Sequence, residues 1–394
     1  MNGDKRVILH IVFDGILFDR VYPSFEGMDN YENRYLLHVF GRSQDLKYIK
    51  NTEKLIRVDT REEWGRVVSD PQVDVIYMHG LWYSYLKLVD YIREGVVVMW
   101  WCYGMEIYEN VLHWPPLLPV KLFKPRTRWF CLIDFGGLHF TSAELSYSFP
   151  KIYILLIRFY SLLKGESIQR IKQLLSRIDF AFTPLASELV ELKKIHPYIK
   201  AKPFVLRRPT VRIPLEKHSV PNGILLEHSA NITNNHLDII AAIKKRKLEI
   251  HGRDIYIPLG YGEKRLAQKV KQEAVFDGAF VHCLMETLPY DKYQEMMSSC
   301  SHAIFGMMRQ SGLGSIYLCF QKGIKTFFYK DSVLYKFFTS MGYIVYTIEN
   351  DLNDIGIRTP LTVEQAKNNY DLYYSYVDEN KTYQQQLDII LNDI

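Results

Sequence analysis

The sequence has few cysteines and no long apolar segment. Its 394 residues contain five cysteines, and none of them stands at the spacing of a metal-ligand or redox pair. Reduced thiols in a cytosolic compartment are the expectation, without a disulfide framework. Residues 1–6 run directly into the apolar stretch 7–13, without the long apolar region and cleavage site of a secretory signal. We therefore expect a cytoplasmic chain whose first element is a β-strand.

Several catalytic motifs are also absent from the sequence. It contains no Asp-x-Asp pair, with which one large class of sugar-nucleotide enzymes holds a metal ion. It also lacks a Walker A sequence, a complete GxGxxG, HExxH and GxSxG. These absences remove the usual reasons to expect a nucleotide triphosphatase, a dehydrogenase, a zinc protease or an α/β-hydrolase. We expect phosphate to be handled without a metal ion, and no cofactor.

The sequence does show the alternation of strand-like and helical segments that is typical of an α/β fold. With 48% hydrophobic and 24% charged residues the composition is globular, and the length suits two or three domains of ~100–200 residues. Strand-like runs separated by helical patterns occur in two series, at 7–13, 73–78, 96–101 and 180–183, and at 224–226, 255–259, 279–283, 303–307, 325–329 and 343–346. This order predicts two Rossmann-like domains with parallel sheets and a cleft between them. The predicted divisions are 1–206, a proline-rich linker 207–222, 223–360 and a helical tail 361–394.

The sequence Arg-Gln-Ser-Gly-Leu-Gly-Ser at 309–315 follows an apolar strand and opens an apolar helical run. Two glycines allow a tight turn, and a helix N-terminus presents amide hydrogens and a dipole that favour an anion. A phosphate would fit there with Arg309 beside it. An ordinary connection between a strand and a helix is the alternative.

Three residues are candidates for the base that an inverting transfer would need. Asp14, His79 and Glu106 each follow a predicted strand, where open α/β sheets bind ligands. A hydrogen-bonded structural histidine, or a capping or solvated carboxylate, is the alternative for each.

The segment 114–177 is basic, with ten Lys or Arg against three acids, a local charge of +7. Apolar and aromatic residues are interleaved with these charges. The longest apolar run, 152–157, is too short to span a bilayer, which needs ~20 residues. It is long enough to lie on an anionic membrane surface, although a core helix with a solvated basic face is the alternative. No nucleic-acid-binding motif accompanies the segment.

Several short pieces occur in an order that resembles the TDP-N-acetylfucosamine:lipid II N-acetylfucosaminyltransferase family, which extends the lipid-linked precursor of enterobacterial common antigen. They are residues 224–229 with Asn231 and 234–236, then 257–261, 290–293 with Cys300, and 309–315 with Leu318 and Gly323; residues 79–80 and 101–109 are similar in the first half. Where the family has glycine and asparagine, this chain has Glu227 and His228.

The resemblance implies a GT-B architecture whose C-terminal domain holds the sugar nucleotide. The positions expected to bind the donor are Ser229, Asn231, Gly260, Tyr261, Tyr290, Arg309, Gln310, Ser311, Gly312, Gly314 and Ser315. Glu106 matches an acidic position of the family. The leading hypothesis is a metal-independent glycosyltransferase that moves a sugar from a TDP- or UDP-sugar to a polyprenyl-diphosphate-linked saccharide, peripherally at the cytoplasmic face of the inner membrane. A sugar-nucleotide epimerase or polysaccharide pyruvyl transferase is the alternative, and a membrane-associated scaffold the third.

Overall fold

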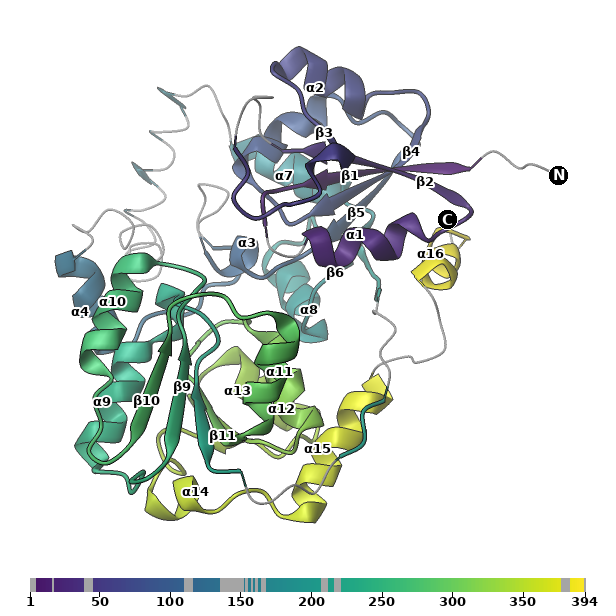
Figure 1. The fold of residues 1–394 in the computed structure, drawn as a ribbon. Helices are drawn as coiled ribbons and strands as arrows, with labels where there is room; N and C mark the ends of the chain where they lie inside the picture. Colours follow the sequence, from purple (N-terminus) through teal and green to yellow (C-terminus); the bar gives the residue numbers. More distant parts are fainter. Residues whose placement is uncertain are drawn as a thin grey trace. The chain divides into compact units, whose positions relative to one another are not determined.

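Two parallel β-sheets organise the chain, each in its own unit. The structure is a computed structural model that describes residues 5–15, 18–38, 45–109, 116–134, 152, 155–156, 159, 162–163, 168–206, 212–215, 221–376 and 383–392. Unit 1 comprises Met1–Pro119, Leu145–Thr210 and Asp378–Ile394, and unit 2 comprises Val120–Glu144 and Val211–Val377 (Figure 1).

Unit 1 contains a seven-stranded sheet in the order β3-β2-β1-β4-β5-β6-β7, with every pair parallel. Its strands are β1 (Arg6–Val12), β2 (Tyr31–Leu37), β3 (Leu55–Ile56), β4 (Val73–His79), β5 (Val97–Trp101), β6 (Phe180–Phe182) and β7 (Lys202–Pro203). Its helices are α1 (Phe18–Glu26), α2 (Arg61–Val68), α3 (Met105–Tyr108), α7 (Ile168–Arg177), α8 (Ala186–Ile195) and α16 (Tyr383–Asn392), with 3-10 turns η1 (Thr52–Lys54) and η2 (Tyr83–Asp90).

The central strands of unit 1 are buried on both faces, as parallel sheets require. Ile8, Val75, Tyr77 and Met99 belong to one core cluster. This continuous burial explains why β1, β4, β5 and β6 were predictable from apolar runs. Strand β2 was not predicted, because its sequence places three polar residues, Glu32 to Arg34, in a row. Strands β3 and β7 are two residues long and leave no pattern.

Unit 2 contains a six-stranded parallel sheet in the order β10-β9-β8-β11-β12-β13. Its strands are β8 (Gly223–Leu226), β9 (Asp254–Pro258), β10 (Phe280–Leu284), β11 (Cys300–Phe305), β12 (Lys325–Phe328) and β13 (Tyr346–Thr347). Its helices are α4 (Pro125–Asp134), α9 (His236–Arg246), α10 (Lys264–Glu273), α11 (Tyr290–Ser298), α12 (Leu313–Gln321), α13 (Val333–Ser340), α14 (Asp354–Arg358) and α15 (Val363–Tyr376), with the 3-10 turn η3 (Ile232–Asn234). All six predicted strands of the second series are present, with ends shifted by up to three residues.

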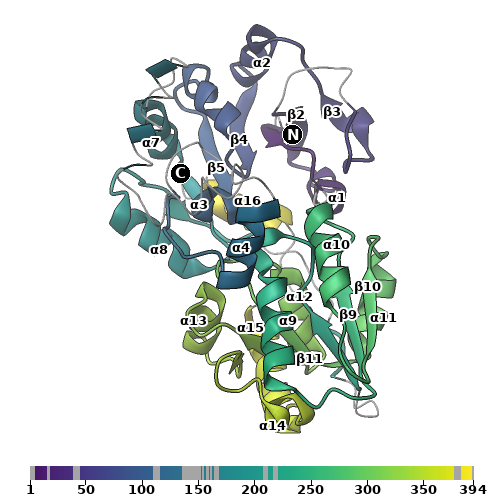
Figure 2. The same ribbon diagram turned by 90° about the vertical axis from the view of Figure 1, so that its left-hand side faces the viewer.

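Two segments group differently from the predicted domain division. Helix α4, assigned from sequence to the first domain, lies beside α9 in unit 2 (Figure 2). The Asp238 carboxylate of α9 accepts hydrogen bonds from the backbone N–H groups of Arg126 and Thr127, at 2.8 and 2.9 Å. A carboxylate at this end of a helix satisfies the orphan amides of the first turn. The acid therefore fastens α4 to unit 2.

The last helix returns to the first unit. The predicted helical tail consists of α15, which belongs to unit 2, and α16, which lies beside α1 in unit 1 (Figure 1). Tyr31 donates a hydrogen bond to Asp388 at 2.6 Å, and Leu387 and Leu391 are buried in the core of unit 1. No helix in the described part of the chain is long and apolar enough to cross a lipid bilayer.

Candidate functional site

Each sheet contains one point where the strand order reverses. In unit 1 it lies between β1 and β4, and in unit 2 between β8 and β11. The loops leaving neighbouring strands diverge there to opposite faces, which opens a crevice at the carboxyl ends of the strands. These two points are therefore where the topology places ligand-binding side chains.

In unit 2, the loop after β8 carries Ser229 and Asn231, and the loop after β9 carries Gly260 and Tyr261. The two loops are joined, because the backbone N–H of Ala230 donates to the carbonyl of Tyr261 at 2.7 Å. The structure thus brings these four predicted residues together.

Asn231 and Gly260 have structural roles in these loops. The Asn231 side chain accepts from the backbone N–H of Thr233 at 3.0 Å and caps η3. A Cβ on Gly260 would lie 2.1 Å from the carbonyl carbon of Glu286, so the glycine allows the loop after β10 to approach closely. Tyr261 is 36% exposed and Tyr290, which opens α11, is 57% exposed. These two rings remain accessible to a ligand.

The third loop leaves β11 and forms the N-terminus of α12, as predicted from the sequence 309–315. Gly312 is the N-cap residue with φ +63°, a conformation that side chains other than glycine rarely adopt. A helix start leaves its first amides without helical partners, and Leu313 and Gly314 occupy these positions. The Ser315 hydroxyl accepts a hydrogen bond from Tyr293 at 2.9 Å. An anion at this end of α12 would meet backbone amides first.

Arg309 and Gln310 are less accessible than the sequence suggested. Arg309 is 3% exposed, and its Nη1 donates to the carbonyl oxygen of Gln310 at 2.6 Å. Gln310 is 6% exposed, and its side-chain oxygen is buried without a hydrogen-bond partner. The Arg309 guanidinium therefore holds the backbone of its own loop. To reach the predicted position beside a phosphate, the side chain would have to turn outward.

Sequence reasoning did not assign Glu227 and His228 to the site. Glu227 is fully buried and has φ +65°, and one of its carboxylate oxygens accepts a hydrogen bond from the backbone N–H of Gly306. Burial raises the pKa of this carboxyl above its ordinary value, an effect that its contacts with His228 oppose. The signal in the sequence was the departure from the family's glycine, because a left-handed conformation is one that glycine adopts without strain.

In unit 1, His79 ends β4 and belongs to a chain of hydrogen bonds. Asn33 donates from Nδ2 to the carbonyl of Phe25 at 2.8 Å, so its Oδ1 is left to accept from His10 Nε2 at 2.9 Å. His10 Nδ1 lies 3.0 Å from His79 Nε2, and His79 Nδ1 lies 3.3 Å from the hydroxyl of Tyr103. Sequence reasoning missed His10 and Asn33, which lie within strands and have no motif around them.

The direction in which these hydrogen bonds are donated fixes the tautomers of both histidine rings. Because His10 donates to Asn33 from Nε2, its Nδ1 accepts from His79, whose own Nδ1 is then the unprotonated nitrogen. Burial lowers the pKa of His10 to about 4 and that of His79 well below its ordinary value. His79 is therefore a neutral imidazole at neutral pH, with a lone pair at the carboxyl end of β4.

The two acids predicted as candidate bases, Asp14 and Glu106, accept hydrogen bonds from backbone amides instead. Asp14 accepts hydrogen bonds from the amides of Lys47, Tyr48 and Ile49, at 2.7 to 3.0 Å, and these use both of its oxygens. Glu106 is 2% exposed and accepts from the Tyr103 amide at 2.9 Å. Among the three candidates for the base, the geometry favours His79.

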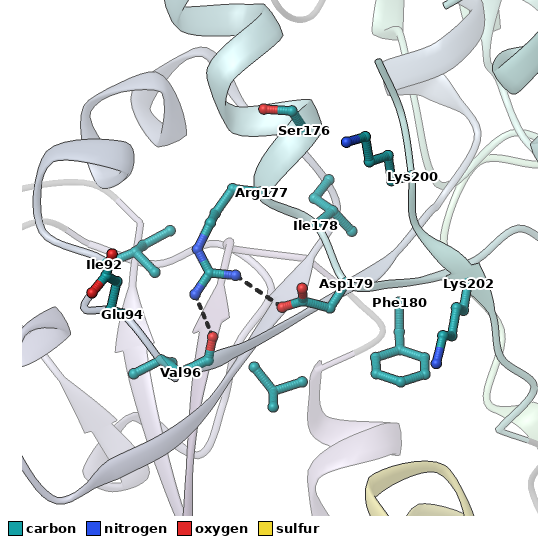
Figure 3. Close-up of a pocket in the computed structure, with 12 residues that line it drawn as sticks. Ile92, Glu94, Val96, Ser176, Arg177, Ile178, Asp179, Phe180, Lys200 and Lys202 are labelled. Carbon is teal, nitrogen blue, oxygen red and sulfur yellow. Dashed lines mark hydrogen bonds and ion pairs between the residues drawn. The ribbon is translucent and has the colours of Figure 1, made fainter. Parts of the chain in front are cut away.

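A separate hollow of about 600 Å³ lies at the amino-terminal edge of the same sheet (Figure 3). Its lining includes Val96 and Asp179, which directly precede β5 and β6, and Lys202, which begins β7. Arg177 points across it, paired with Asp179 at 2.9 Å and hydrogen-bonded to the carbonyl of Val96 (Figure 3). No predicted site residue lines this hollow, and α/β sheets bind ligands at the opposite edge.

Comparison with known proteins identifies a family over the second half of the chain. Residues 193–368 match the model of the family described as 4-alpha-L-fucosyltransferase, glycosyl transferase group 56. This match covers most of unit 2, and it confirms the resemblance to a fucosaminyltransferase family that the short pieces of the sequence predicted.

Three solved structures share the fold. WaaG, a glycosyltransferase involved in lipopolysaccharide biosynthesis, is 10% identical with a TM-score of 0.55, over 97% of this chain and 99% of WaaG. Sucrose-phosphate synthase from Thermosynechococcus elongatus is 9% identical with a TM-score of 0.57, over 98% of this chain and 99% of that protein. A protein assigned as a UDP-N-acetylglucosamine 2-epimerase from Listeria monocytogenes is 10% identical with a TM-score of 0.50, over 98% and 95%.

At these identities the solved structures show the fold alone, two Rossmann-like domains of the GT-B type, and the family match shows the activity. The chain is a glycosyltransferase with the GT-B fold, and its residues 193–368 match the group 56 family.

Proposed function

We propose that this enzyme transfers a deoxy-amino sugar from a TDP- or UDP-sugar to a polyprenyl-diphosphate-linked saccharide during synthesis of a bacterial surface polysaccharide, without a metal ion. One observation carries the donor half of the proposal. The loops after β8, β9 and β11 converge at the point where the sheet of unit 2 reverses, together with the first turn of α12. Diphosphates bind at such a helix start.

The chemistry explains what these residues would do. When the anomeric carbon–oxygen bond breaks, negative charge grows on the departing diphosphate while the sugar ring becomes positively charged. Fixed donors aimed at that charge lower the barrier. The backbone amides from Ser311 to Gly314 would supply them, and the accessible rings of Tyr261 and Tyr290 would border the nucleoside or sugar.

If the anomeric configuration inverts, the acceptor hydroxyl must lose its proton to a base. We propose His79 for this role, because its Nδ1 is unprotonated and lies at the carboxyl end of β4. A positioned base contributes ~10²- to 10⁴-fold in rate.

The lipid-linked acceptor would bring the enzyme to the cytoplasmic face of the inner membrane. The described apolar residues between 152 and 163 are all exposed: Ile152 53%, Leu155 64%, Leu156 54%, Phe159 65%, Leu162 80% and Leu163 70%. Their spacing of three or four residues places most of them on one helical face. The basic residues Lys151, Arg158 and Lys164 of this segment lie outside the described residues, and the sequence places them among the apolar ones.

Helix α4 adds a second exposed apolar surface. Trp129 is 65% exposed and Ile133 60% exposed. Beside this helix, Lys264, Arg265 and Lys269 of α10 line a hollow of about 520 Å³. Exposed aromatic and aliphatic side chains next to cations match the interface of an anionic bilayer.

The transfer is tested with a panel of TDP- and UDP-sugars, with and without a polyprenyl-diphosphate saccharide. Release of nucleoside diphosphate that depends on the acceptor, unaffected by a chelator, supports the proposal. Sugar isomerisation without an acceptor would support an epimerase instead. Loss of turnover on chelation would contradict the metal-independent transfer.

Membrane contact is tested by sedimentation with vesicles that contain phosphatidylglycerol. Leu155→Asn combined with Phe159→Asn should weaken binding roughly tenfold or more, because two apolar side chains leave the lipid. Val275→Asn changes a 68% exposed residue of unit 2 and is the matched control. Equal binding of both variants would contradict the membrane role of residues 152–163.

A further inference from the structure

Glu227 combines three features that stability alone does not explain. Its backbone is left-handed, its side chain is fully buried, and its Oε2 has no hydrogen-bond partner. Strained backbone and unsatisfied buried polar atoms persist where function requires them. The bond from the Gly306 amide uses only Oε1, a contact that a neutral amide side chain could also make.

The unpartnered oxygen faces one neighbour. Glu227 Oε2 lies 3.4 Å from His228 Nδ1, whose side chain is 14% exposed. A carboxylate at this distance attracts an N–H group on Nδ1 and so orients the ring. Glu227 thus positions His228, whose other ring nitrogen is open to a ligand.

The imidazole stands at the start of α12. A Cβ on Gly312 would lie 2.6 Å from His228 Nδ1, so the ring rests directly against that glycine. His228 Nε2 lies 3.5 Å from the Ser311 hydroxyl. This contact is long for a hydrogen bond, so Nε2 remains available to a ligand oxygen.

The surroundings of the pair supply no second described carboxylate in contact with His228. His236 on α9 interacts electrostatically with His228, and burial lowers the pKa of His236 to about 3, so it is neutral. Tyr293 on α11 and Tyr329 after β12 interact with Glu227, and burial raises the pKa of both phenols, so they are neutral too. Arg309 lies two residues before Ser311 on the loop that faces His228. The charged side chains on these elements are Asp238, Lys244, Lys245 and Arg246 of α9, Asp291, Lys292 and Glu295 of α11, and Glu227 and Arg309 of the loops.

We propose that His228 is a catalytic residue that donates from Nε2 to the departing diphosphate, and that Glu227 is the positioning residue that orients its ring. This inference rests on the proposed function. As the bond between the anomeric carbon and the diphosphate oxygen breaks, its electron pair stays on that oxygen, where the Nε2–H group meets the charge. The acceptor oxygen forms the new bond to the anomeric carbon, and its proton passes to the base.

The test compares His228→Asn and Glu227→Gln with the wild type. His282→Asn is the matched control, since His282 also pairs with a carboxylate, Asp254, at 2.7 Å, but both groups are exposed and Asp254 begins β9 at the other edge of the sheet. We expect His228→Asn to reduce kcat by ~10²-fold or more with little change in acceptor KM. Glu227→Gln should reduce kcat less, because the imidazole remains but a carboxylate no longer orients it.

Calorimetric binding of TDP, UDP and inorganic pyrophosphate gives a second readout that needs no turnover. His228→Asn should weaken pyrophosphate binding relative to the wild type, and His282→Asn should not. If His228→Asn matches His282→Asn in kcat and in pyrophosphate affinity, the inference is overturned. If the wild type releases no nucleoside diphosphate with any donor, the proposed function fails instead. Circular dichroism checks folding, and His228→Gln replaces His228→Asn should the latter be unfolded.

Discussion

The two sheets have the same topology around their reversal points but treat polar groups there in different ways. In unit 1, His10, Asn33 and His79 form a continuous chain in which donors and acceptors are matched. In unit 2, Glu227 Oε2, Gln310 Oε1 and both ring nitrogens of His236 are buried without partners. A completed network fixes one tautomer of one base, whereas unsatisfied groups beside a helix start suit a site that an anionic ligand completes.

The largest expected effect comes from replacing His79, the last residue of the hydrogen-bonded series in unit 1. His79→Asn should reduce kcat by ~10²- to 10⁴-fold, because the proposed base is lost, while affinity for the nucleoside diphosphate should stay unchanged. Steady-state kinetics and calorimetry measure the two quantities. His196→Asn, which changes a half-buried histidine hydrogen-bonded to the Leu117 carbonyl, is the control. Full turnover in His79→Asn would move the role of base to Glu106 or Asp14.

A methyl group at the start of α12 should affect only the proposed donor site of unit 2. Gly312→Ala places a Cβ 2.6 Å from His228 and forces a left-handed alanine, so donor affinity should fall ~10-fold or more. Gly252→Ala has nearly the same backbone strain, with φ +71° and nothing within 4 Å of the added Cβ. Calorimetry with TDP should separate the two variants, and an equal loss of affinity would show that strain alone is responsible.

Acid should destabilise both units through buried neutral histidines. Burial lowers the pKa of His10 and His38 to about 4, and that of His236 and His302 to about 3. The unfolded chain binds these protons below about pH 6.5 while the folded chain does not, so stability falls as pH drops from there toward the folded pKa values. Each ring contributes up to about 1.4 kcal/mol per pH unit. Urea unfolding at several pH values measures the slope, which should become shallower in His38→Gln.

The smallest effect on catalysis is expected for Asp14→Asn. The substitution weakens bonds to three backbone amides, so it should cost about 1 to 3 kcal/mol of stability and leave kcat unchanged. Thermal unfolding and kinetics under identical conditions distinguish the two roles. A large loss of kcat with normal stability would return Asp14 to the list of candidate bases.

The sequence determined the fold class and predicted the start of α12, where we propose the donor binds, because both depend on local pattern. Apolar runs of three to seven residues between helical stretches predicted ten of the thirteen strands in the described part of the chain, and the paired glycines at 312 and 314 marked the start of α12. The resemblance over the second half was informative for the same reason, since its pieces are the short loops that follow these strands.

Only the tertiary structure decided which side chains share a site. His10 and His79 are 69 residues apart and meet because β1 and β4 are neighbours, and Glu227 approaches Gly306 because β8 lies beside β11. The same long-range packing buried Arg309, engaged Asp14 with the backbone, and attached α4 to unit 2 and α16 to unit 1. Local patterns specify which element a residue belongs to, whereas strand order and burial specify its neighbours, and chemistry depends on the neighbours.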